Sequence, residues 1–384
     1  MITKENVILT DQQENAVNTA IKSVVTNNKC LSIGGYAGTG KTTVLKNIIK
    51  GLEDEGENES IPCAFTGKAA LRMRQKGVYD ACTIHSTIYH YVKDTNSFVK
   101  RPEVKGDFFI IDEASMIPSP LWKDILSYRY PIILVGDLGQ LEPVGDDPQL
   151  MKSPNVILDK IHRQAQQSSI IQFATKVRMN ESDRFTCQYN KNEVNIIRPR
   201  FLSDDYLMSA DIIICAFNKT RIDVNTRLRR LKDISSPLPV EGDRIICLTN
   251  NQKIGCFNGE MFTIIKTLRT TDTYIECLVK PDADEEFLCK LNIKQFNNVK
   301  NMSKEGTWTQ SKYSPNKKYF KPLIPDADKY MFADFGYCIT CHKSQGSEWD
   351  KVLVIDEQCS SLWDAQRWRY TAITRAAKEL IYVL

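Results

Sequence analysis

Residues 35–42, GYAGTGKT, combine glycines, a lysine and a threonine in the order G-x-x-x-x-G-K-[ST]. The stretch lies between an apolar run and an amphipathic one, which is the context that a phosphate-binding loop needs. Glycines let backbone N–H groups turn towards phosphate oxygens, and the N-terminus of the following helix adds partial positive charge. We expect Lys41 to reach the β- and γ-phosphates of a nucleoside triphosphate and Thr42 to hold Mg²⁺. The predicted nucleotide contacts are Gly35, Tyr36, Ala37, Gly38, Thr39, Gly40, Lys41, Thr42 and Thr43.

An acidic pair, Asp112 and Glu113, follows the apolar run FFII. Such a run predicts a buried strand, and α/β sheets bind ligands at the carboxyl ends of their strands. We expect Asp112 to hold the metal ion through its waters and Glu113 to accept the proton of the attacking water. A second I-D-E sequence ends in Asp356 and Glu357, but its late place in the chain favours a strand end in another domain.

Three further stretches carry polar side chains suited to phosphate or sugar. VGDLGQLEPVG (135–145) holds Asp137 and Gln140, a polar pair suited to sensing a γ-phosphate. TGKAA (66–70) and TIHS (83–86) supply hydroxyls, a lysine and a histidine at expected loop and helix starts, where they suit a sugar-phosphate backbone. Each stretch alone also fits an ordinary helix start, so the information lies in their order.

CITCHKSQG (338–346) contains C-x-x-C-H, the spacing of covalent haem attachment, and C-x-x-C is also half of many zinc sites. Haem attachment goes with export, and the first residues, MITKENVILTDQQENAV, lack the apolar core of a signal peptide. No second C-x-x-C or His pair stands at a typical zinc-site distance. We therefore expect neither haem nor zinc, and interpret the scattered cysteines as small packing residues.

Length and composition exclude some classes of protein. The 384 residues, 42% hydrophobic and 26% charged, allow two or three domains with ordinary cores. No apolar run reaches the roughly 18 residues of a membrane span, so we expect no membrane association and a cytoplasmic protein. The net charge of +4 is small for a protein that coats nucleic acid by charge alone, so nucleic-acid binding requires a local groove.

Apolar runs alternate with helical patterns from about residue 11 to 150 and again from 165 to 235. Apolar strands separated by helices predict a parallel sheet covered on both faces. From about 240 to 333 the pattern becomes β-rich, with an Asn-Gly hairpin signal at 258–259. After it, the stretch 335–340 predicts one more buried strand, followed by a loop. The predicted fold class is α/β, with two doubly wound parallel sheets and a β-rich insert in the second domain.

In their order, these stretches resemble the motifs of the superfamily 1B DNA helicases, on the RecD/Dda-like branch. The matching stretches between about residues 9 and 376 are LTDQQ, GYAGTGKT, AFTGKAA, TIHS, IIDEAS, GDLGQLEPV, LDKIHRQ, TCHKSQG and YTAITRA. The resemblance implies two RecA-like P-loop domains, with ATP and Mg²⁺ between them and single-stranded DNA across both. It implies domain 1A at 1–164, with a short β-hairpin (1B) at about 87–106. Domain 2A would comprise 165–240 and 334–384, and an SH3-like domain 2B would comprise 241–333.

The resemblance also assigns residues. Gln13 would contact adenine, Gln345 and Gly346 would lie at the nucleotide, and Arg163 and Arg375 would be arginine fingers, each worth roughly 10³ to 10⁵ in rate. The implied catalytic set is Lys41, Asp112, Glu113, Gln140, Arg163 and Arg375. The implied DNA contacts are Thr66, Lys68, Thr83, His85, Phe98, Pro143, Asn218, Thr340, His342 and Lys343.

The chain departs from the branch at two places. Tyr36 stands where these P-loops commonly have proline, and its ring either touches the nucleotide or packs. The run YVKDTNSFV (91–99) leaves room for only a short hairpin. Phe98 near its turn is either the wedge that splits a duplex or an aromatic packed on its own hairpin.

The expected activity is that of an ATP-dependent DNA helicase that moves 5′ to 3′ on single-stranded DNA and unwinds forked duplex DNA in replication, recombination or repair. A single-strand-binding protein or replisome component is the expected protein partner, and the compact size together with the resemblance suggests a phage protein in its host's cytosol. Two alternatives stay open. One is a translocase on single-stranded DNA or RNA that does not unwind, and the other is the motor subunit of a larger recombination or nuclease complex.

Overall fold

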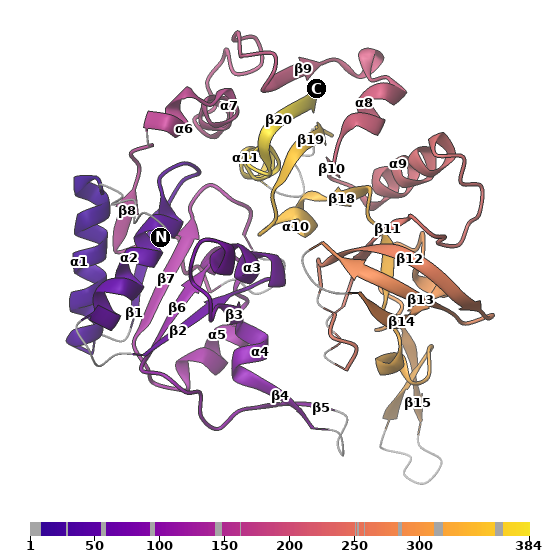
Figure 1. Ribbon diagram of the computed structural model, residues 1–384, viewed down its shortest axis with the longest axis horizontal. Coiled ribbons are helices and arrows are strands. Elements are labelled where there is room, and N and C mark those ends of the chain that lie inside the picture. Colours follow the sequence, from indigo (N-terminus) through magenta and orange to yellow (C-terminus); the bar gives the residue numbers. More distant parts are fainter. Residues whose placement is uncertain are drawn as a thin grey trace, which may run out of the picture. The chain divides into compact units, whose positions relative to one another are not determined.

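The computed structural model describes residues 9–27, 30–54, 59–92, 97–142, 148–161, 163–249, 251, 253–256, 258–282, 286–310, 318–357 and 364–384. Side chains are described at these residues except 54, 91–92, 97–98, 163–164, 307–310 and 318–322. The chain forms two compact units (Figure 1). Unit 1 is Met1–Val194, Gly346–Glu348 and Ser360–Ala377, and unit 2 is Asn195–Gln345, Trp349–Cys359 and Lys378–Leu384.

Unit 1 is built on a six-stranded sheet with the order β3-β2-β6-β7-β1-β8. Its strands are β1 (Cys30–Gly35), β2 (Ser60–Ala64), β3 (Cys82–Thr83), β6 (Phe108–Asp112), β7 (Ile132–Asp137) and β8 (Val156–Leu158). Every pairing between them is parallel. Successive residues of β6 enter different cores, since Phe108 and Ile110 pack in one cluster and Phe109 and Ile111 in another. The near-continuous apolar runs of the sequence thus reflect burial of both sheet faces.

Unit 1 also contains helices. They are α1 (Asp11–Val25), α2 (Lys41–Asp54), α3 (Gly67–Gln75), α4 (Ile84–Ile88), α5 (Ser119–Leu126), α6 (Arg163–Gln167), α7 (Ser169–Arg178) and α11 (Ala365–Ile373), with the short 3₁₀ turn η1 (Ala114–Met116) after β6. The core with α1 and α2 covers one face, and the core with α4 and α5 covers the other. The predicted short hairpin is present as β4 (Tyr89–Val92) and β5 (Ser97–Lys100), which pair antiparallel.

Unit 2 contains a second sheet with the order β18-β10-β19-β20-β9. Its strands are β9 (Val194–Ile197), β10 (Ile212–Cys215), β18 (Cys338–Thr340), β19 (Trp349–Ile355) and β20 (Ala376–Val383). Strand β10 pairs parallel with both β18 and β19. The accompanying helices are η2 (Pro199–Phe201), α8 (Asp204–Ser209), α9 (Asn218–Leu231) and α10 (Cys341–Ser344). Two parallel sheets in one chain confirm the predicted α/β class.

The β-rich segment forms a third sheet, with the order β14-β13-β12-β11-β17. Its strands are β11 (Arg244–Cys247), β12 (Met261–Thr270), β13 (Tyr274–Pro281), β14 (Phe287–Asn292) and β17 (Ala333–Phe335), with the 3₁₀ turns η3 (Ile293–Gln295) and η4 (Ala327–Lys329). All pairings in it are antiparallel. Strands β15 (Gly306–Gln310) and β16 (Lys318–Pro322) pair antiparallel as a separate two-stranded ribbon.

The stretch 335–340 is two strands rather than the single strand that we predict from the sequence. β17 pairs antiparallel with β11 in the β-rich sheet, and β18 pairs parallel with β10 in the other sheet. Gly336 lies at the change of sheet, where a Cβ would be 3.0 Å from the Ile245 carbonyl carbon and 2.8 Å from Met261 Cε. A continuous apolar run hides this break because both strands are buried. The predicted loop after it begins instead with the short helix α10.

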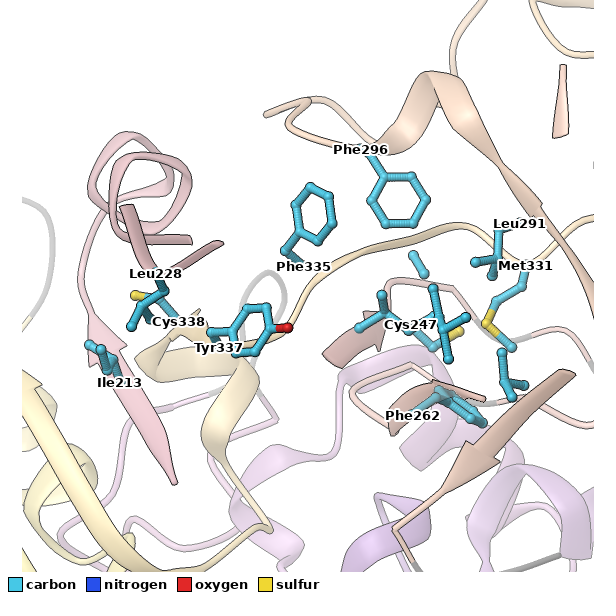
Figure 2. Packing of buried hydrophobic residues seen from close by; sticks show 14 of the residues in the cluster. Ile213, Leu228, Cys247, Phe262, Leu291, Phe296, Met331, Phe335, Tyr337 and Cys338 are labelled. Carbon is cyan, nitrogen blue, oxygen red and sulfur yellow. The ribbon is translucent and has the colours of Figure 1, made fainter. Parts of the chain in front are cut away.

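One hydrophobic core runs through both sheets of unit 2. It contains Ile213 from β10 and Leu228 from α9 together with Phe262 from β12 and Leu291 from β14. Figure 2 shows Phe335 and Tyr337 between these two groups. The β-rich insert therefore shares its core with the parallel sheet. The predicted domain boundaries at 240/241 and 333/334 remain a prediction.

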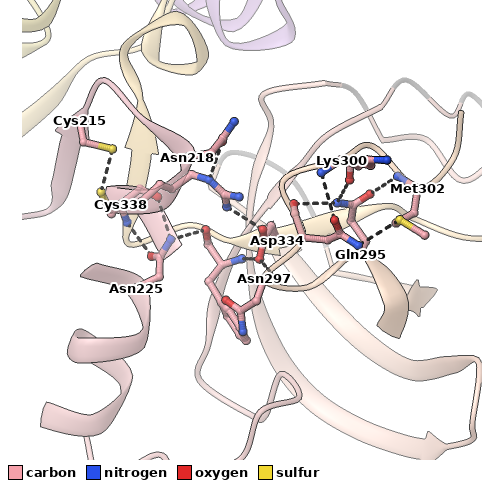
Figure 3. A network of polar contacts seen from close by, with 12 residues as sticks. Cys215, Asn218, Asn225, Gln295, Asn297, Lys300, Met302, Asp334 and Cys338 are labelled. Carbon is pink, nitrogen blue, oxygen red and sulfur yellow. Dashed lines mark hydrogen bonds and ion pairs between the residues drawn. The ribbon is translucent and has the colours of Figure 1, made fainter. Parts of the chain in front are cut away.

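A buried polar stripe on α9 reinforces this junction. Arg221 donates to Asp334 at 2.6 Å, with both side chains 7% exposed or less. One turn on, the Asn225 amide donates to the carbonyls of Phe335 and Cys338, and another turn on, Arg229 pairs with Asp243. Figure 3 shows Asp334 linked in turn to the Asn297 backbone. The spacing of four residues places all three polar side chains on one face of the helix.

Among the residues that the structure describes, no helix is both long and apolar enough to cross a membrane.

Asp334→Ala should lower the free energy of unfolding by about 3 to 5 kcal/mol, because it leaves the buried Arg221 guanidinium without its partner. Urea unfolding followed by circular dichroism measures this loss. Asp350→Ala is the matched control, since Asp350 pairs with Lys378 at an exposed site, and it should change stability little. Equal losses in the two variants would contradict a structural role for the buried pair.

Candidate functional site

The carboxyl ends of three neighbouring strands meet at one edge of the unit 1 sheet. Since β6, β7 and β1 are adjacent, the end of β6 at Asp112, the end of β7 at Asp137 and the loop after β1 come together. A cavity of about 400 Å³ opens there. It is lined by Tyr36, Ala37, Gly38, Gly40, Lys41, Thr42, Thr43, Ala69, Arg72, Met73, Lys76, Asp112, Glu113, Asp137, Gln140, Ser168, Ile170, Ile171, Glu348, Thr374, Arg375, Ala376 and Ala377.

The loop between β1 and α2 has the conformation that the glycines predict. Gly38 and Gly40 have φ values of 79° and 80°, which favour glycine. A Cβ on Gly38 would also lie 2.9 Å from the Ala165 side chain. The Lys41 ammonium donates to the carbonyls of Gly35 and Tyr36 and to Asp137 Oδ2, each at 3.0 Å. Lys41 is thus held at the cavity by two carbonyls and one carboxylate.

The acidic pair lies at the cavity in an unusual backbone. Glu113 has a φ of 54°, and such left-handed non-glycine residues cluster at functional sites. Its N–H donates to Asp112 Oδ1 at 2.8 Å. Burial raises the pKa of Asp112, and burial, with the negative charge of Asp112 next, raises the pKa of Glu113. Among the described residues, the buried Glu113 Oε2 has no hydrogen-bond partner.

Gln140 and Arg375 also line the cavity, as the sequence predicts. Gln140 Oε1 is buried and has no hydrogen-bond partner within the described part of the chain. Arg375 is 3% exposed and donates to the Thr371 and Ser347 carbonyls. Its positive charge lowers the pKa of Glu113, against the larger effect of burial. Arg163 begins α6, but its side chain lies outside the described residues.

The predicted adenine contact of Gln13 has no direct support in the geometry. Gln13 is 1% exposed and is absent from the cavity lining. Its amide donates to the Thr39 carbonyl at 3.0 Å and accepts from the Thr10 N–H at 3.1 Å. The residue therefore caps α1 and holds the loop between β1 and α2, and its contact with adenine stays a prediction.

Gln345 and Gly346 do not line the cavity either. Gln345 is buried in unit 2. Gly346 belongs to unit 1 and has a φ of 72°, and a Cβ there would be 2.5 Å from Thr66 Oγ1. Glycine is thus needed for contact with the start of α3. The role of both residues at the nucleotide stays a prediction.

Three charged cavity residues, Arg72, Lys76 and Glu348, escape prediction from the sequence. Arg72 and Lys76 lie one turn apart on the helix after TGKAA, and Arg72 pairs with Glu348. Burial, followed by repulsion from Arg72, lowers the pKa of Lys76. The four-residue spacing of Arg72 and Lys76 on a predicted helix could have indicated that both lie on one face of it. Tyr370, whose hydroxyl bonds to the loop at Ala37, had no such indication.

Four of the six predicted DNA contacts of unit 1 have side chains that the structure describes. Thr66 and Thr83 cap α3 and α4, accepting from the N–H groups of Ala69 and Ser86. His85 has aromatic neighbours at 6.1 Å (Phe65) and 5.9 Å (Tyr89), and burial lowers its pKa. Lys68 lies in the first turn of α3.

Unit 2 holds the other group of predicted DNA contacts. Asn218 begins α9, Thr340 is the N-cap of α10, and His342 and Lys343 follow within α10. Burial lowers the pKa of His342 and that of Lys343, the latter to about 8. Lys343 donates to Asn258 of the β-rich insert.

Pro143 and the side chain of Phe98 lie outside the described residues.

The cysteines of C-x-x-C-H are buried. Cys338 Sγ lies 3.6 Å from Cys215 Sγ in the shared core, and Cys341 is fully buried as well. Within the described ranges, no group of three or more His, Cys, Asp or Glu residues is placed to hold a metal ion. Absence of haem and zinc stays a prediction, and packing accounts for both cysteines.

Comparison with known proteins adds to this geometry. Residues 8–197 match the family model of an AAA domain, and residues 335–383 match that of a UvrD-like helicase C-terminal domain. The ATP-dependent DNA helicase dda of Enterobacteria phage T4 is 36% identical over 145 residues, covering 35% of this chain and 33% of that protein. The ATP-dependent RecD2 DNA helicase of Deinococcus radiodurans is 25% identical over 365 residues, covering 91% of this chain and 46% of that protein. The chain thus spans less than half the length of these relatives.

A solved structure extends the likeness of fold. The crystal structure of Bacteroides Pif1 bound to ssDNA superimposes with a TM-score of 0.58 at 18% identity. The match covers 98% of this chain and 92% of that one. At this identity, the similarity concerns the fold.

Glu113→Gln should stabilise the free protein at pH 7 by about 1 kcal/mol, as is common when strained functional sites are relieved. The pKa of Glu113 is raised, so the folded protein favours the protonated carboxyl group. The stability that this group contributes is lost as pH rises through that pKa. Urea unfolding at pH 7 and pH 4 should therefore show a difference between variant and wild type that shrinks at the lower pH. The exposed Glu103, changed to Gln, is the control. A variant less stable than wild type at pH 7 would contradict this assignment of charge.

Proposed function

Because the chain belongs to the superfamily 1B helicases, on the RecD/Dda-like branch, we propose that it is an ATP-dependent DNA helicase. The observation that carries this proposal is a cavity of unit 1 at which Lys41, the pair Asp112 and Glu113, and Arg375 converge. These are a phosphate-binding cation, two carboxylates and a second cation. Phosphoryl transfer needs this combination.

The donor set fits ATP with Mg²⁺. Thr42 and Asp112 both line the cavity and offer the hard oxygen ligands that Mg²⁺ prefers,. When bound, the ion neutralises charge on the β- and γ-phosphates. Few protein ligands are expected because Mg²⁺ usually keeps waters and substrate oxygens.

Glu113 is the proposed general base. Its raised pKa brings it closer to the operating pH, which favours proton transfer, and its partnerless Oε2 is placed to accept from a water. Gln140, with a buried partnerless oxygen, orients that water or senses the γ-phosphate. Lys41 and Arg375 stabilise the charge that develops on the transferred group, with Arg163 as the proposed second arginine finger.

We propose that single-stranded DNA is bound by residues of both units. The set is Thr66, Lys68, Thr83 and His85 of unit 1 and Asn218, Thr340, His342 and Lys343 of unit 2. We expect these side chains to contact phosphate and sugar, which suit hydroxyl, amide and ammonium groups and carry no sequence information directly. A motor that tracks along any sequence needs this indifference. Movement 5′ to 3′, a role in replication, recombination or repair, a cytosolic location and a single-strand-binding or replisome partner complete the proposal.

A fork assay tests the function directly. Duplexes with a single 5′ tail or a single 3′ tail are incubated with the protein, ATP and Mg²⁺, and strand separation is followed by fluorescence. We expect unwinding of the 5′-tailed substrate only, and none with Lys41→Ala or Glu113→Gln. The Glu113→Gln protein should still bind ATP. No unwinding of either substrate by a protein that hydrolyses ATP would favour a translocase or a subunit of a larger complex.

Single-stranded DNA binding should weaken between pH 7.5 and 9, because Lys343 loses its charge as pH rises through a pKa of about 8. The two buried histidines have lowered pKa values and do not titrate in this range. Loss of one charge should also reduce the salt slope of log K by about 0.7. Fluorescence anisotropy measures both effects. Lys343→Arg, which keeps its charge, should bind equally well across the range, and a parallel decline in that variant would refute the role of Lys343.

A further inference from the structure

Asp137 is a buried carboxylate with three partners. It is 2% exposed. Its Oδ2 accepts from Lys41 Nζ at 3.0 Å and from the Tyr370 hydroxyl at 3.2 Å, and its Oδ1 accepts from the Gly139 N–H at 2.9 Å. A buried carboxylate is costly unless it is paired and hydrogen-bonded. These contacts therefore satisfy Asp137 while Lys41 points towards it.

Tyr370 joins this carboxylate to the phosphate-binding loop. Its hydroxyl accepts from the Ala37 N–H at 2.7 Å and donates to Asp137. Its ring packs against Gly139, where a Cβ would lie 2.7 Å away. Burial, and next the negative charge of Asp137, raise the pKa of Tyr370, so the hydroxyl keeps the proton that it donates. The tyrosine is a fixed donor beside a carboxylate.

We propose that Asp137 changes its principal partner when ATP binds, and that Tyr370 is the positioning residue that makes this change possible. In the nucleotide-free protein the carboxylate is neutralised by Lys41. When the lysine turns to the β- and γ-phosphates, the carboxylate keeps only Tyr370 and Gly139. The inference rests on the ATP site proposed above.

The exchange makes the hydroxyl more important with ATP than without it. Without nucleotide, Asp137 has a full positive charge at hydrogen-bond distance. With nucleotide, that charge is shared with the phosphates. The Tyr370 hydroxyl and the Gly139 N–H then contribute more of the stabilisation of the Asp137 carboxylate. Hydrogen bonds to charged groups are stronger than neutral ones. Removing the hydroxyl therefore weakens ATP binding through Asp137, although Tyr370 itself does not line the cavity.

Tyr370 lies on helix α11, so this helix is linked to the loop that is proposed to bind the nucleotide. The hydroxyl of Thr371 accepts from the Leu141 N–H at 2.9 Å, and Arg367 pairs with Glu142 at 2.8 Å. These contacts fasten the helix to the loop after β7, next to Asp137. The same helix leads into Arg375, so Tyr370 holds the arginine-bearing segment in place while Lys41 changes partner.

A double-mutant cycle on ATP affinity tests the proposal. Dissociation constants for ATP are measured without DNA for wild type, Tyr370→Phe, Asp137→Asn and the double variant. Tyr370→Phe keeps the ring and should bind ATP about tenfold more weakly. Asp137→Asn has no buried charge to neutralise and should bind at least as tightly as wild type. The double variant should match Asp137→Asn within about twofold, because the hydroxyl acts only through the carboxylate.

Tyr382→Phe is the matched control. Tyr382 is fully buried in unit 2 and donates to Asp356 at 2.7 Å, so this change removes the same kind of bond away from the cavity. It should leave ATP affinity unchanged. Wild-type ATP affinity for Tyr370→Phe, an equal loss in the Asp137→Asn background, or weaker binding by Asp137→Asn alone would each overturn the inference. Failure of the wild type to bind ATP would instead refute the proposed function.

Discussion

The site depends on the burial of three carboxylates at one sheet edge. Asp112, Glu113 and Asp137 end or follow strands that are neighbours in the sheet, so the order β6-β7-β1 forces like charges together. Burial raises the pKa values of Asp112 and Glu113, and nearby cations act against it. These cations are Lys41, Arg72, Lys76 and Arg375. Binding of the proposed triphosphate at this cavity would redistribute these partners.

In unit 2, buried polar contacts and a shared core join two sheets. Its parallel sheet and its β-rich sheet share one core, and α9 adds a stripe of buried polar side chains at the junction. Asn218 at the start of α9 accepts from Arg221, which is held by Asp334. Glu357 fixes the preceding loop by accepting from the Ala216 and Phe217 N–H groups. The shared core and the buried polar contacts therefore support the residues of this unit that are proposed to contact nucleic acid.

Sequence alone predicted what depends on local pattern. The loop at 35–42 and the acidic pair are where glycine spacing and a strand end place them, and Glu357 does follow a strand of the other unit as expected. The continuous run at 335–340 concealed a change of sheet, because both strands are buried and only the tight packing around Gly336 marks the break. Gln13 and Tyr370 depend on contacts across 26 and 333 residues of sequence. Such contacts leave no periodic pattern to detect.

The central claim is that one cavity hydrolyses ATP under the control of bound DNA. The most direct measurement is the steady-state rate of ATP hydrolysis by the purified protein as an oligothymidylate of increasing concentration is added. We predict a low rate without DNA that rises and saturates with the oligonucleotide, and no hydrolysis in the Lys41→Ala variant. A rate that is independent of DNA, or that survives Lys41→Ala, would contradict the account.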